Sequence, residues 1–307
     1  MNPTVSVIIP TCDRPTTLVQ ALHSITTQRG PDVEVLIVND GGAEVGQAVA
    51  RFAGLLDVRL VSRAAGAGPS TARNQAIDVA AGQYLAFLDD DDIFLPGYLA
   101  SAVDRLSRGD VDLVHHTALV TDHRVDPFDP GDVRAGEAFD LPFDPDFFSV
   151  LNYIATTTVV CRSFRDAGIR FDPSLRAVED WDLWLRLVHR HGYRIGHEPK
   201  PGGVYHRVPA SGAVTAGQTA MLRMFHDCYV ELCGRWPVPA GGRTDAYRRR
   251  LLDVYRLAFA RHADGRQLDT FWYQRVVRLL HNGFTGSIDE DRLTELLPAA
   301  LEGVASR

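Results

Sequence analysis

The chain has 307 residues and a mass of 33.8 kDa, enough for one large globular domain or two modest ones with a sizeable core. With 45% hydrophobic and 23% charged residues, it is not a largely disordered, collagen-like or coiled-coil chain. A net charge of −7 argues against a general electrostatic hold on nucleic acid, and Lys200 is the only lysine, which disfavours phosphate-loop and Schiff-base lysines elsewhere.

Strands and helices are expected to alternate along the first hundred residues. Short apolar runs, typical of buried parallel strands, lie at residues 5–10, 33–38, 58–61 and 84–88, and the first of them is β-branched. Helices are predicted between them: one at about 16–25, where apolar residues recur at helical spacing, a short polar one at about 43–52, and one at 70–80. Thr16 or Asp13 is expected to cap the first helix, and Ser70 the third. The alternation predicts a doubly wound, mostly parallel α/β sheet with right-handed crossovers.

The second half of the chain has a mixed pattern. It predicts helices at 99–106 and 181–191, strands at 111–116 and 155–161, and a long packed loop at 128–147. From about Met221 onward we expect helices, with a hinge at 237–242.

Membrane insertion and export are not expected. The longest apolar runs are strand-sized, whereas a transmembrane helix needs roughly 20 residues. The N-terminus leads directly into a strand, without a basic segment and an apolar signal core. The four cysteines form no C-x-x-C pair and are expected to be reduced, so we expect a cytoplasmic protein without structural zinc.

Acidic residues are concentrated at the predicted carboxyl ends of the strands, where α/β sheets bind ligands. Asp13 follows the first strand, Asp40 the second, and Asp89 to Asp92 the fourth. Four adjacent carboxylates repel one another unless a cation lies among them, and their hard oxygen atoms suit Mg²⁺ or Mn²⁺. A solvated acidic turn is the alternative interpretation.

The residues that could hold a nucleotide each have a second interpretation. No glycine follows the first strand, where a Rossmann dinucleotide fingerprint would lie, so a nicotinamide cofactor is disfavoured. Asp40, which precedes Gly41 and Gly42, suits a base N–H or a ribose hydroxyl but also an ordinary turn. Arg73 suits a diphosphate, although a surface arginine is the commoner case.

Two further sites carry candidate chemistry. Glu179 and Asp180 precede the helix at 181–191, where carboxylates serve either as helix caps or, if one reaches a substrate hydroxyl, in catalysis. His206 lies near the end of the α/β region and is the histidine best placed to be a ligand.

These motifs, in this order, resemble the family 2 glycosyltransferases, which are inverting, nucleotide-sugar-dependent enzymes of the GT-A fold. The resemblance covers about residues 5–211. It rests on VSVIIPTCDR at 5–14, VNDG at 38–41, ARN at 72–74, FLDDDD at 87–92 and EDWDLWLRL at 179–187. It implies a Rossmann-like GT-A domain over residues 1–215, with a nucleotide-binding half at 1–106 and an acceptor-binding half at 107–215, followed by a C-terminal helical region at 216–307.

The resemblance also implies roles for individual residues. The donor, a UDP-, dTDP- or GDP-linked sugar, would be bound by Pro10, Thr11, Asp13, Arg14, Asp40, Arg73, Asp89 and Asp90. Asp91 would be the main ligand of Mg²⁺ or Mn²⁺, with Asp89 and His206 as further ligands. Asp180 would be the catalytic base, assisted by Glu179.

The sequence therefore predicts a metal-dependent inverting glycosyltransferase acting on the hydroxyl of a cell-envelope glycan, a glycolipid or a natural product. A sugar-phosphate nucleotidyltransferase is disfavoured, because no Gly or Lys lies between Pro10 and Gln28. A non-catalytic nucleotide-sugar-binding scaffold is disfavoured, because it needs no base. The C-terminal helices are expected to pack on the catalytic domain or on a second subunit, which would make a homodimer.

Overall fold

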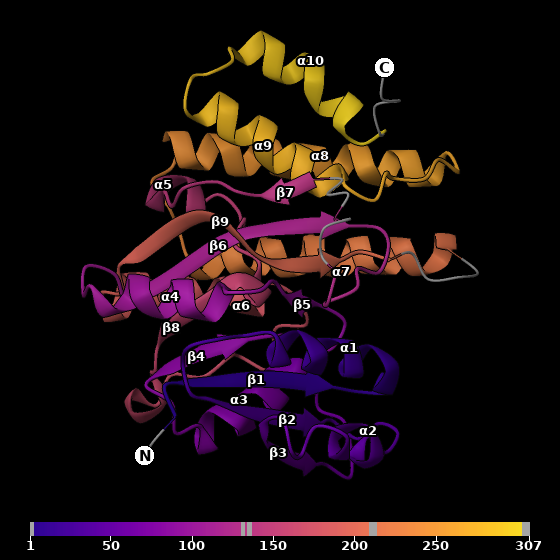
Figure 1. The fold of residues 1–307 in the computed structure, drawn as a ribbon. Helices are drawn as coiled ribbons and strands as arrows, with labels where there is room; N and C mark the ends of the chain where they lie inside the picture. Colours follow the sequence, from indigo (N-terminus) through magenta and orange to yellow (C-terminus); the bar gives the residue numbers. More distant parts are fainter. Residues whose placement is uncertain (1–2, 130–132, 134–136, 209–213, 303–307) are drawn as a thin grey trace. The chain divides into compact units, whose positions relative to one another are not determined.

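The computed structural model describes residues 3–129, 133, 137–208 and 214–302, and the chain falls into two compact units (Figure 1). The first unit comprises Met1–Phe143 and Ile154–His206, and the second comprises Asp144–Tyr153 and Arg207–Arg307. The second unit therefore includes a segment from the middle of the chain in addition to the C-terminal region. The division of the first unit into a nucleotide-binding and an acceptor-binding half stays a prediction.

A mixed nine-stranded sheet forms the centre of the first unit. Its strands are β1 Val5–Thr11, β2 Val33–Asn39, β3 Asp57–Ser62, β4 Tyr84–Phe87, β5 Ile93–Phe94, β6 Leu113–Thr121, β7 Glu137–Phe139, β8 Val159–Arg162 and β9 Ile195–His206. The order is β3-β2-β1-β4-β8-β6-β9-β5, with β7 paired to β6. Strands β3, β2, β1 and β4 are parallel, β8 is antiparallel to both β4 and β6, and β9 is parallel to β6. The predicted doubly wound α/β class is confirmed.

Helices cover both faces of this sheet, because alternate residues of a strand point to opposite faces. The helices of the first unit are α1 Pro15–Thr26, α2 Gly46–Ala50, α3 Pro69–Val79, α4 Tyr98–Ser107 and α6 Glu179–His191. Val5, Val7 and Ile9 of β1 share one hydrophobic core with residues of α1, α2 and α4. On the other face, the ring of Phe87 in β4 lies 5.8 Å from that of Trp184 in α6.

The predicted helix caps were wrong. The N-cap of α1 is Arg14 and that of α3 is Gly68, and neither side chain caps its helix. Both helices begin with a proline, Pro15 or Pro69, which has no N–H to satisfy and a φ already suited to a helix. Ser70 is buried inside α3 instead.

The second half of the sheet differs most from the prediction. Strand β9 was not predicted, because its Pro199, Pro201 and three glycines resemble a turn. Register shifts where it pairs with β6 accommodate this composition. A 3-10 turn at Thr156–Thr158 precedes β8, where a continuous strand was expected. The predicted loop at 128–147 contains β7, and its residues 130–132 and 134–136 lie outside the described residues.

The second unit is helical, as predicted. It contains α5 Pro145–Phe148, α7 Val214–Arg235, α8 Arg243–Ala263, α9 Trp272–Phe284 and α10 Glu290–Ala300. Buried Arg248 of α8 holds the 144–153 segment, because its Nε donates to the Ser149 carbonyl at 2.8 Å. The Tyr229 hydroxyl likewise donates to the Val150 carbonyl at 2.9 Å. Within the described ranges, no helix combines the length and apolar composition that a membrane crossing requires.

Candidate active site

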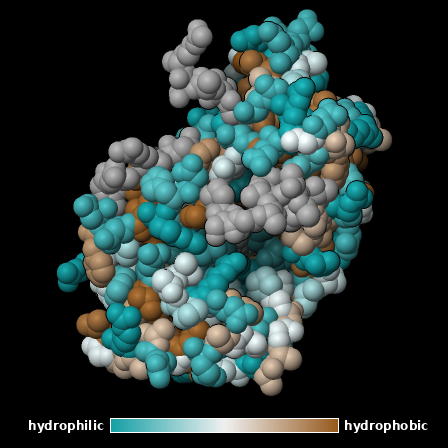
Figure 2. All heavy atoms as spheres, turned by 90° about the vertical axis from the view of Figure 1, so that its right-hand side faces the viewer, coloured by the Kyte–Doolittle hydropathy of each residue, from teal (hydrophilic) through white to brown (hydrophobic). Residues whose placement is uncertain are grey.

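The candidate site lies at the carboxyl ends of the parallel strands. In Figure 1 the arrowhead of β1 points to the side that Figure 2 shows face-on, and many hydrophilic side chains lie on that face. The segments at 12–14, 40–45, 63–68 and 89–92 follow β1, β2, β3 and β4 in turn. The sequence therefore placed the segments after β1, β2 and β4 at the correct edge of the sheet.

Two glycines allow three of these segments to touch backbone to backbone. A Cβ on Gly41 would lie 2.4 Å from the backbone nitrogen of Gly66, and one on Gly42 would lie 2.5 Å from that of Asp13. Gly41 also has a φ of +80°, which residues with side chains rarely adopt. The Asp-Gly-Gly motif at 40–42 is therefore both a turn and a contact point.

Asp40 and Asp13 hold these segments together. The carboxylate of Asp40 accepts hydrogen bonds from the N–H groups of Ala67, at 3.0 Å, and Gly68, at 2.7 Å. The Asp13 carboxylate accepts one from the Ala43 N–H at 2.7 Å. Both acids, predicted to bind the nucleotide, shape the loops that would border it. Pro10 lies buried in β1, paired with Val38 of β2.

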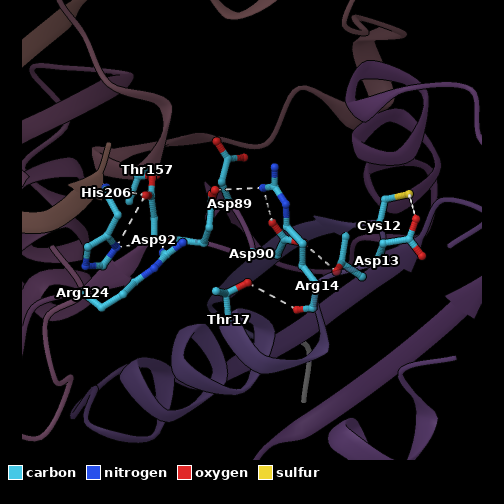
Figure 3. A network of polar contacts seen from close by, with 12 residues as sticks. Cys12, Asp13, Arg14, Thr17, Asp89, Asp90, Asp92, Arg124, Thr157 and His206 are labelled. Atoms are coloured by element: carbon cyan, nitrogen blue, oxygen red, sulfur yellow. Dashed lines mark hydrogen bonds and ion pairs between the residues drawn. The ribbon is translucent and has the colours of Figure 1, made fainter. Parts of the chain in front are cut away.

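Arginines neutralise the acidic turn at 89–92, and Figure 3 shows Arg14 beside it. The Nη1 of Arg14 lies 2.8 Å from Asp91 Oδ2 and 3.1 Å from Asp90 Oδ1. The hydroxyl of Thr11 donates to Asp90 Oδ2 at 2.7 Å. Arg124 donates to the main-chain carbonyl of Asp91. The carboxylate repulsion that suggested a metal in the sequence is thus already reduced by the chain's own cations.

Arg73 joins this turn to the Glu-Asp pair. Its Nη2 lies 2.6 Å from Asp89 Oδ1, and its Nη1 lies 2.8 Å from Glu179 Oε1. The guanidinium also lies over the ring of Phe171, 5.4 Å from its centroid. Burial alone lowers the pKa of Arg73, but the two carboxylates outweigh it and raise the pKa. Arg73 is a fixed, buried cation between two acids that are 90 residues apart in the chain.

His206 has a different role from the predicted metal ligand. Its Nε2 accepts a hydrogen bond from the Val125 N–H at 3.2 Å, so its Nδ1 carries the proton and donates to the Asp91 carbonyl at 2.8 Å. Burial lowers the pKa of His206 to about 4, which keeps the ring neutral. Both nitrogens are engaged, and neither offers a lone pair to a cation in this arrangement. His206 instead positions the backbone of the aspartate turn.

Asp92 anchors the same turn to Thr157 and to the end of β9. Its carboxylate accepts hydrogen bonds from the Thr157 hydroxyl at 2.5 Å and from the His206 N–H at 2.9 Å (Figure 3). Asp92 is completely buried, and burial with the nearby charges of Asp89 and Asp91 raises its pKa well above the usual range. Its role is structural, which distinguishes it from the partly exposed Asp89 and Asp91.

Asp180 has the features of a general base. Its Oδ2 accepts a hydrogen bond from the Thr156 hydroxyl at 2.7 Å, and its Oδ1 accepts one from the Trp181 N–H at 2.7 Å. Burial and the negative charge of Glu179 raise the pKa of Asp180 to about 6. A carboxyl group with this pKa is ionised at neutral pH yet more basic than an ordinary aspartate.

Backbone strain lies at both ends of the site. Asp13 and Val178 are the non-glycine residues with positive φ among those the structure describes, and each has a φ of +56°. Val178 is the N-cap of α6 and immediately precedes Glu179 and Asp180. A β-branched residue in this conformation costs roughly 1–3 kcal/mol, and such strain concentrates at functional sites.

The donor set at Asp89 and Asp91 fits a hard divalent cation. Arg73 binds Oδ1 of Asp89 and Arg14 binds Oδ2 of Asp91, so each ion pair uses one oxygen of its carboxylate. Burial and the charge of Asp89 raise the pKa of Asp91, so a further positive charge would be stabilising. In the described part of the chain no three His, Cys, Asp or Glu side chains form a ready-made metal site. Mg²⁺ and Mn²⁺ commonly use one or two carboxylates together with substrate phosphates.

Sequence reasoning missed four residues that build the site. Thr156 and Thr157 bind Asp180 and Asp92, Arg124 binds the Asp91 carbonyl, and Phe171 lies beneath Arg73. The run of three threonines at 156–158 was visible in the sequence as an excess of hydroxyls. Nothing local connected it to aspartates as distant as position 92.

Comparisons with known proteins agree with this fold. The family model described as Glycosyl transferase family 2 matches residues 6–172. A protein described as a colanic acid biosynthesis glycosyl transferase, WcaA of Escherichia coli K12, is 31% identical over 202 residues, covering 62% of this chain and 68% of that protein. The amylovoran biosynthesis glycosyltransferase AmsB of Erwinia amylovora is 27% identical, covering 72% of this chain and 75% of that protein. The structure of the mannosyltransferase PcManGT from Pyrobaculum calidifontis, with GDP-Man and Mn²⁺, aligns with a TM-score of 0.59 at 18% identity, covering 98% of this chain and 85% of the other.

Proposed function

We propose that this chain, which belongs to glycosyltransferase family 2, transfers a sugar from a nucleoside-diphosphate sugar to an acceptor hydroxyl. The proposed transfer inverts the anomeric configuration and uses a divalent metal ion. The observation that carries the proposal is a continuous chain of contacts from the base to the acidic turn. Asp180 adjoins Glu179, Glu179 binds Arg73, and Arg73 binds Asp89. The proposed base, Asp180, and the acidic turn that would bind the metal thus belong to one network of contacts.

Asp180 is the proposed base. It takes the proton of the acceptor hydroxyl as that oxygen attacks the anomeric carbon. The Thr156 hydroxyl and the Trp181 N–H both donate to this carboxylate and fix its orientation. The pKa of about 6 suits this task near neutral pH, because the group is ionised but still basic.

Inversion follows from the roles of the two acids. A new bond forms between the acceptor oxygen and the anomeric carbon while the bond to the donor diphosphate breaks, and the electron pair leaves with the diphosphate. A retaining route by double displacement would need a second carboxylate as nucleophile. Glu179 is held by Arg73 at 2.8 Å, so it assists by orienting the network rather than by attacking the sugar.

Negative charge develops on the departing diphosphate. Asp91 and Asp89 are the residues that would hold Mg²⁺ or Mn²⁺, and an ion bound there supplies charge neutralisation to the leaving group. The structure of PcManGT with GDP-Man and Mn²⁺ supports the pairing of such a metal with a donor of this class. We propose that Thr11, Asp40 and Asp90, with Pro10 and Asp13, form the wall beside the nucleotide.

The matched test compares three asparagine variants. Release of nucleoside diphosphate is measured from UDP-, dTDP- and GDP-sugars with Mn²⁺ present, and donor binding is measured by thermal shift. Asp180→Asn is expected to keep donor binding and lose at least about 100-fold in transfer rate, the usual contribution of general-base catalysis. Asp91→Asn is expected to lose the response to Mn²⁺. Asp182→Asn, on the same helix but ion-paired with Arg186, is the control and should still transfer.

Three results would contradict the proposal. An Asp180→Asn variant with an undiminished rate removes the base assignment. A product whose anomeric proton coupling in NMR shows retained configuration removes the inverting mechanism. Pyrophosphate release from a sugar phosphate and a nucleoside triphosphate would favour the nucleotidyltransferase instead.

A further inference from the structure

Arg14 and Arg73 neutralise the acidic turn in different ways. The Arg73 side chain is 5% exposed and is held by two carboxylates and an aromatic ring. The Arg14 side chain is 55% exposed, and its Nη1 alone contacts both Asp90 and Asp91. One cation is therefore built into the protein, whereas the other rests on the surface of the turn.

The backbone of Arg14 is anchored although its side chain is exposed. Its carbonyl accepts hydrogen bonds from the Leu18 N–H at 3.1 Å and from the Thr17 hydroxyl at 3.3 Å, which fix it to the first turn of α1. The guanidinium can change partners without unfolding the helix, because an exposed ion pair contributes little stability and long side chains exchange rotamers rapidly.

The contact between Arg14 and Asp91 conflicts with the role proposed for Asp91. A dication on this carboxylate would lie within a few ångströms of the guanidinium, and two like charges at that distance repel. The dication carries twice the charge of the guanidinium, so it is the stronger partner for a carboxylate pair. Binding of the metal therefore disfavours the present position of Arg14.

We infer that Arg14 is an exchangeable counter-ion: it holds Asp91 while the metal is absent, and it moves to the donor diphosphate when the metal replaces it. This inference rests on the proposed function, since it assigns a coupling to the same site. The freed guanidinium suits the new partner, because its planar fork binds two phosphate oxygens at once. Arg14 then makes metal binding and donor binding mutually favourable, because each removes a cost from the other.

The exchange predicts opposite effects on two ligands. Without nucleotide, Arg14→Gln is expected to bind Mn²⁺ about two- to five-fold more tightly than the wild type, because no cation has to be displaced; the range is the value of one exposed ion pair. With Mn²⁺ saturating, the same variant is expected to bind a nucleoside diphosphate at least about five-fold more weakly, since a charge-assisted contact is lost. A residue that only binds phosphate would weaken the second affinity and leave the first unchanged.

The experiment measures Mn²⁺ binding by the EPR signal of the free ion and UDP and GDP binding by calorimetry. Arg63→Gln is the matched control, because it also removes one positive charge from this edge of the sheet but contacts Asp40 instead of Asp91. Arg14→Lys keeps the charge but loses the fork, so it should resemble the wild type towards Mn²⁺ and Arg14→Gln towards the diphosphate. If Arg14→Gln fails to fold, the lysine variant alone provides the second comparison.

The outcomes separate the two proposals. Equal Mn²⁺ affinity of Arg14→Gln and Arg63→Gln overturns the exchange and leaves the proposed reaction intact. Unchanged diphosphate affinity in both Arg14 variants overturns it as well. A wild-type protein that binds no Mn²⁺, with or without nucleotide, overturns the metal requirement of the proposed function and the exchange with it.

Discussion

Replacing Asp180 by Asn is expected to stabilise the fold at neutral pH while it abolishes transfer. Burial and the charge of Glu179 raise the pKa of Asp180 to about 6, from 3.8 for an ordinary aspartate. The folded chain therefore binds the proton of this carboxyl more tightly than the unfolded chain does. Folding opposes ionisation here, so the carboxylate destabilises the protein wherever the unfolded group would be ionised.

The size of the effect follows from the two pKa values. A folded pKa about 2 higher than the unfolded one corresponds to a destabilisation of about 3 kcal/mol at pH 7 and above. Asparagine keeps the shape and removes the charge. Its Oδ1 can accept from the Trp181 N–H while its Nδ2 donates to Thr156, and imperfect geometry in these bonds costs up to about 1 kcal/mol. The net expected gain is about 2 kcal/mol.

The measurement is urea unfolding of both proteins between pH 4 and pH 8. The difference in the free energy of unfolding between the two proteins is expected to change along this pH range. Below about pH 4 the carboxyl is protonated in both states, so the gain is lost and the variant should be up to about 1 kcal/mol less stable than the wild type. As the pH rises from about 4 to about 6, the wild type loses stability relative to the variant, and above pH 6 the difference stays constant.

Asp182→Asn provides the opposite control. Asp182 is a buried carboxylate on the same helix, but it is ion-paired with Arg186 at 2.8 Å, so its removal leaves a partly buried guanidinium without this partner and should destabilise the protein. The reasoning is refuted if Asp180→Asn is less stable than the wild type at pH 8, or if the difference between them does not change with pH.

Three further outcomes are expected. The transfer rate kcat/KM should fall about tenfold per pH unit below about pH 6, and a flat pH profile would contradict the base role of Asp180. Arg73→Leu should destabilise the protein by about 2 kcal/mol in urea unfolding, because Asp89 and Glu179 lose their shared cation; a neutral effect would show that the pair contributes nothing. Val178→Gly should stabilise it by about 1 kcal/mol by relieving the positive φ, and a loss of thermal stability would contradict the strain argument.

The predictable part of the fold was the part whose signals are local. Runs such as 5–10 and 84–88 lie in the interior of the sheet and are buried on both faces, so their composition alone marks them as strands. Strand β9 contains prolines and glycines and pairs through an irregular register, so its local composition indicated a turn. Only its tertiary pairing with β6 makes it a strand.

The site was predictable in its residue types and unpredictable in its pairing. Asp89 and Asp91 follow β4 at the sheet edge where the sequence placed them, and Asp180 lies at the start of α6. The sequence also required a cation among the four aspartates, but it had no means of selecting Arg14, 77 positions away from Asp91, as one of those cations. His206 was expected to bind a metal, yet its bonds to Val125 and the Asp91 carbonyl use both nitrogens. Residue type indicates which groups a side chain can bind, whereas the fold determines which of those groups lie within its reach.

A site that admits and releases a charged donor at every turnover needs a fixed part and an exchangeable part. The fixed part consists of groups whose charges are satisfied within the protein: Asp92 on Thr157, and Arg73 between Asp89 and Glu179. These groups keep the turn and the base in register, since none of them has to change partner. The exchangeable part is the exposed ion pair between Arg14 and Asp91, which is the most weakly held contact of the same network. Because only that contact opens, the electrostatic rearrangement stays at the substrate and does not reach the core.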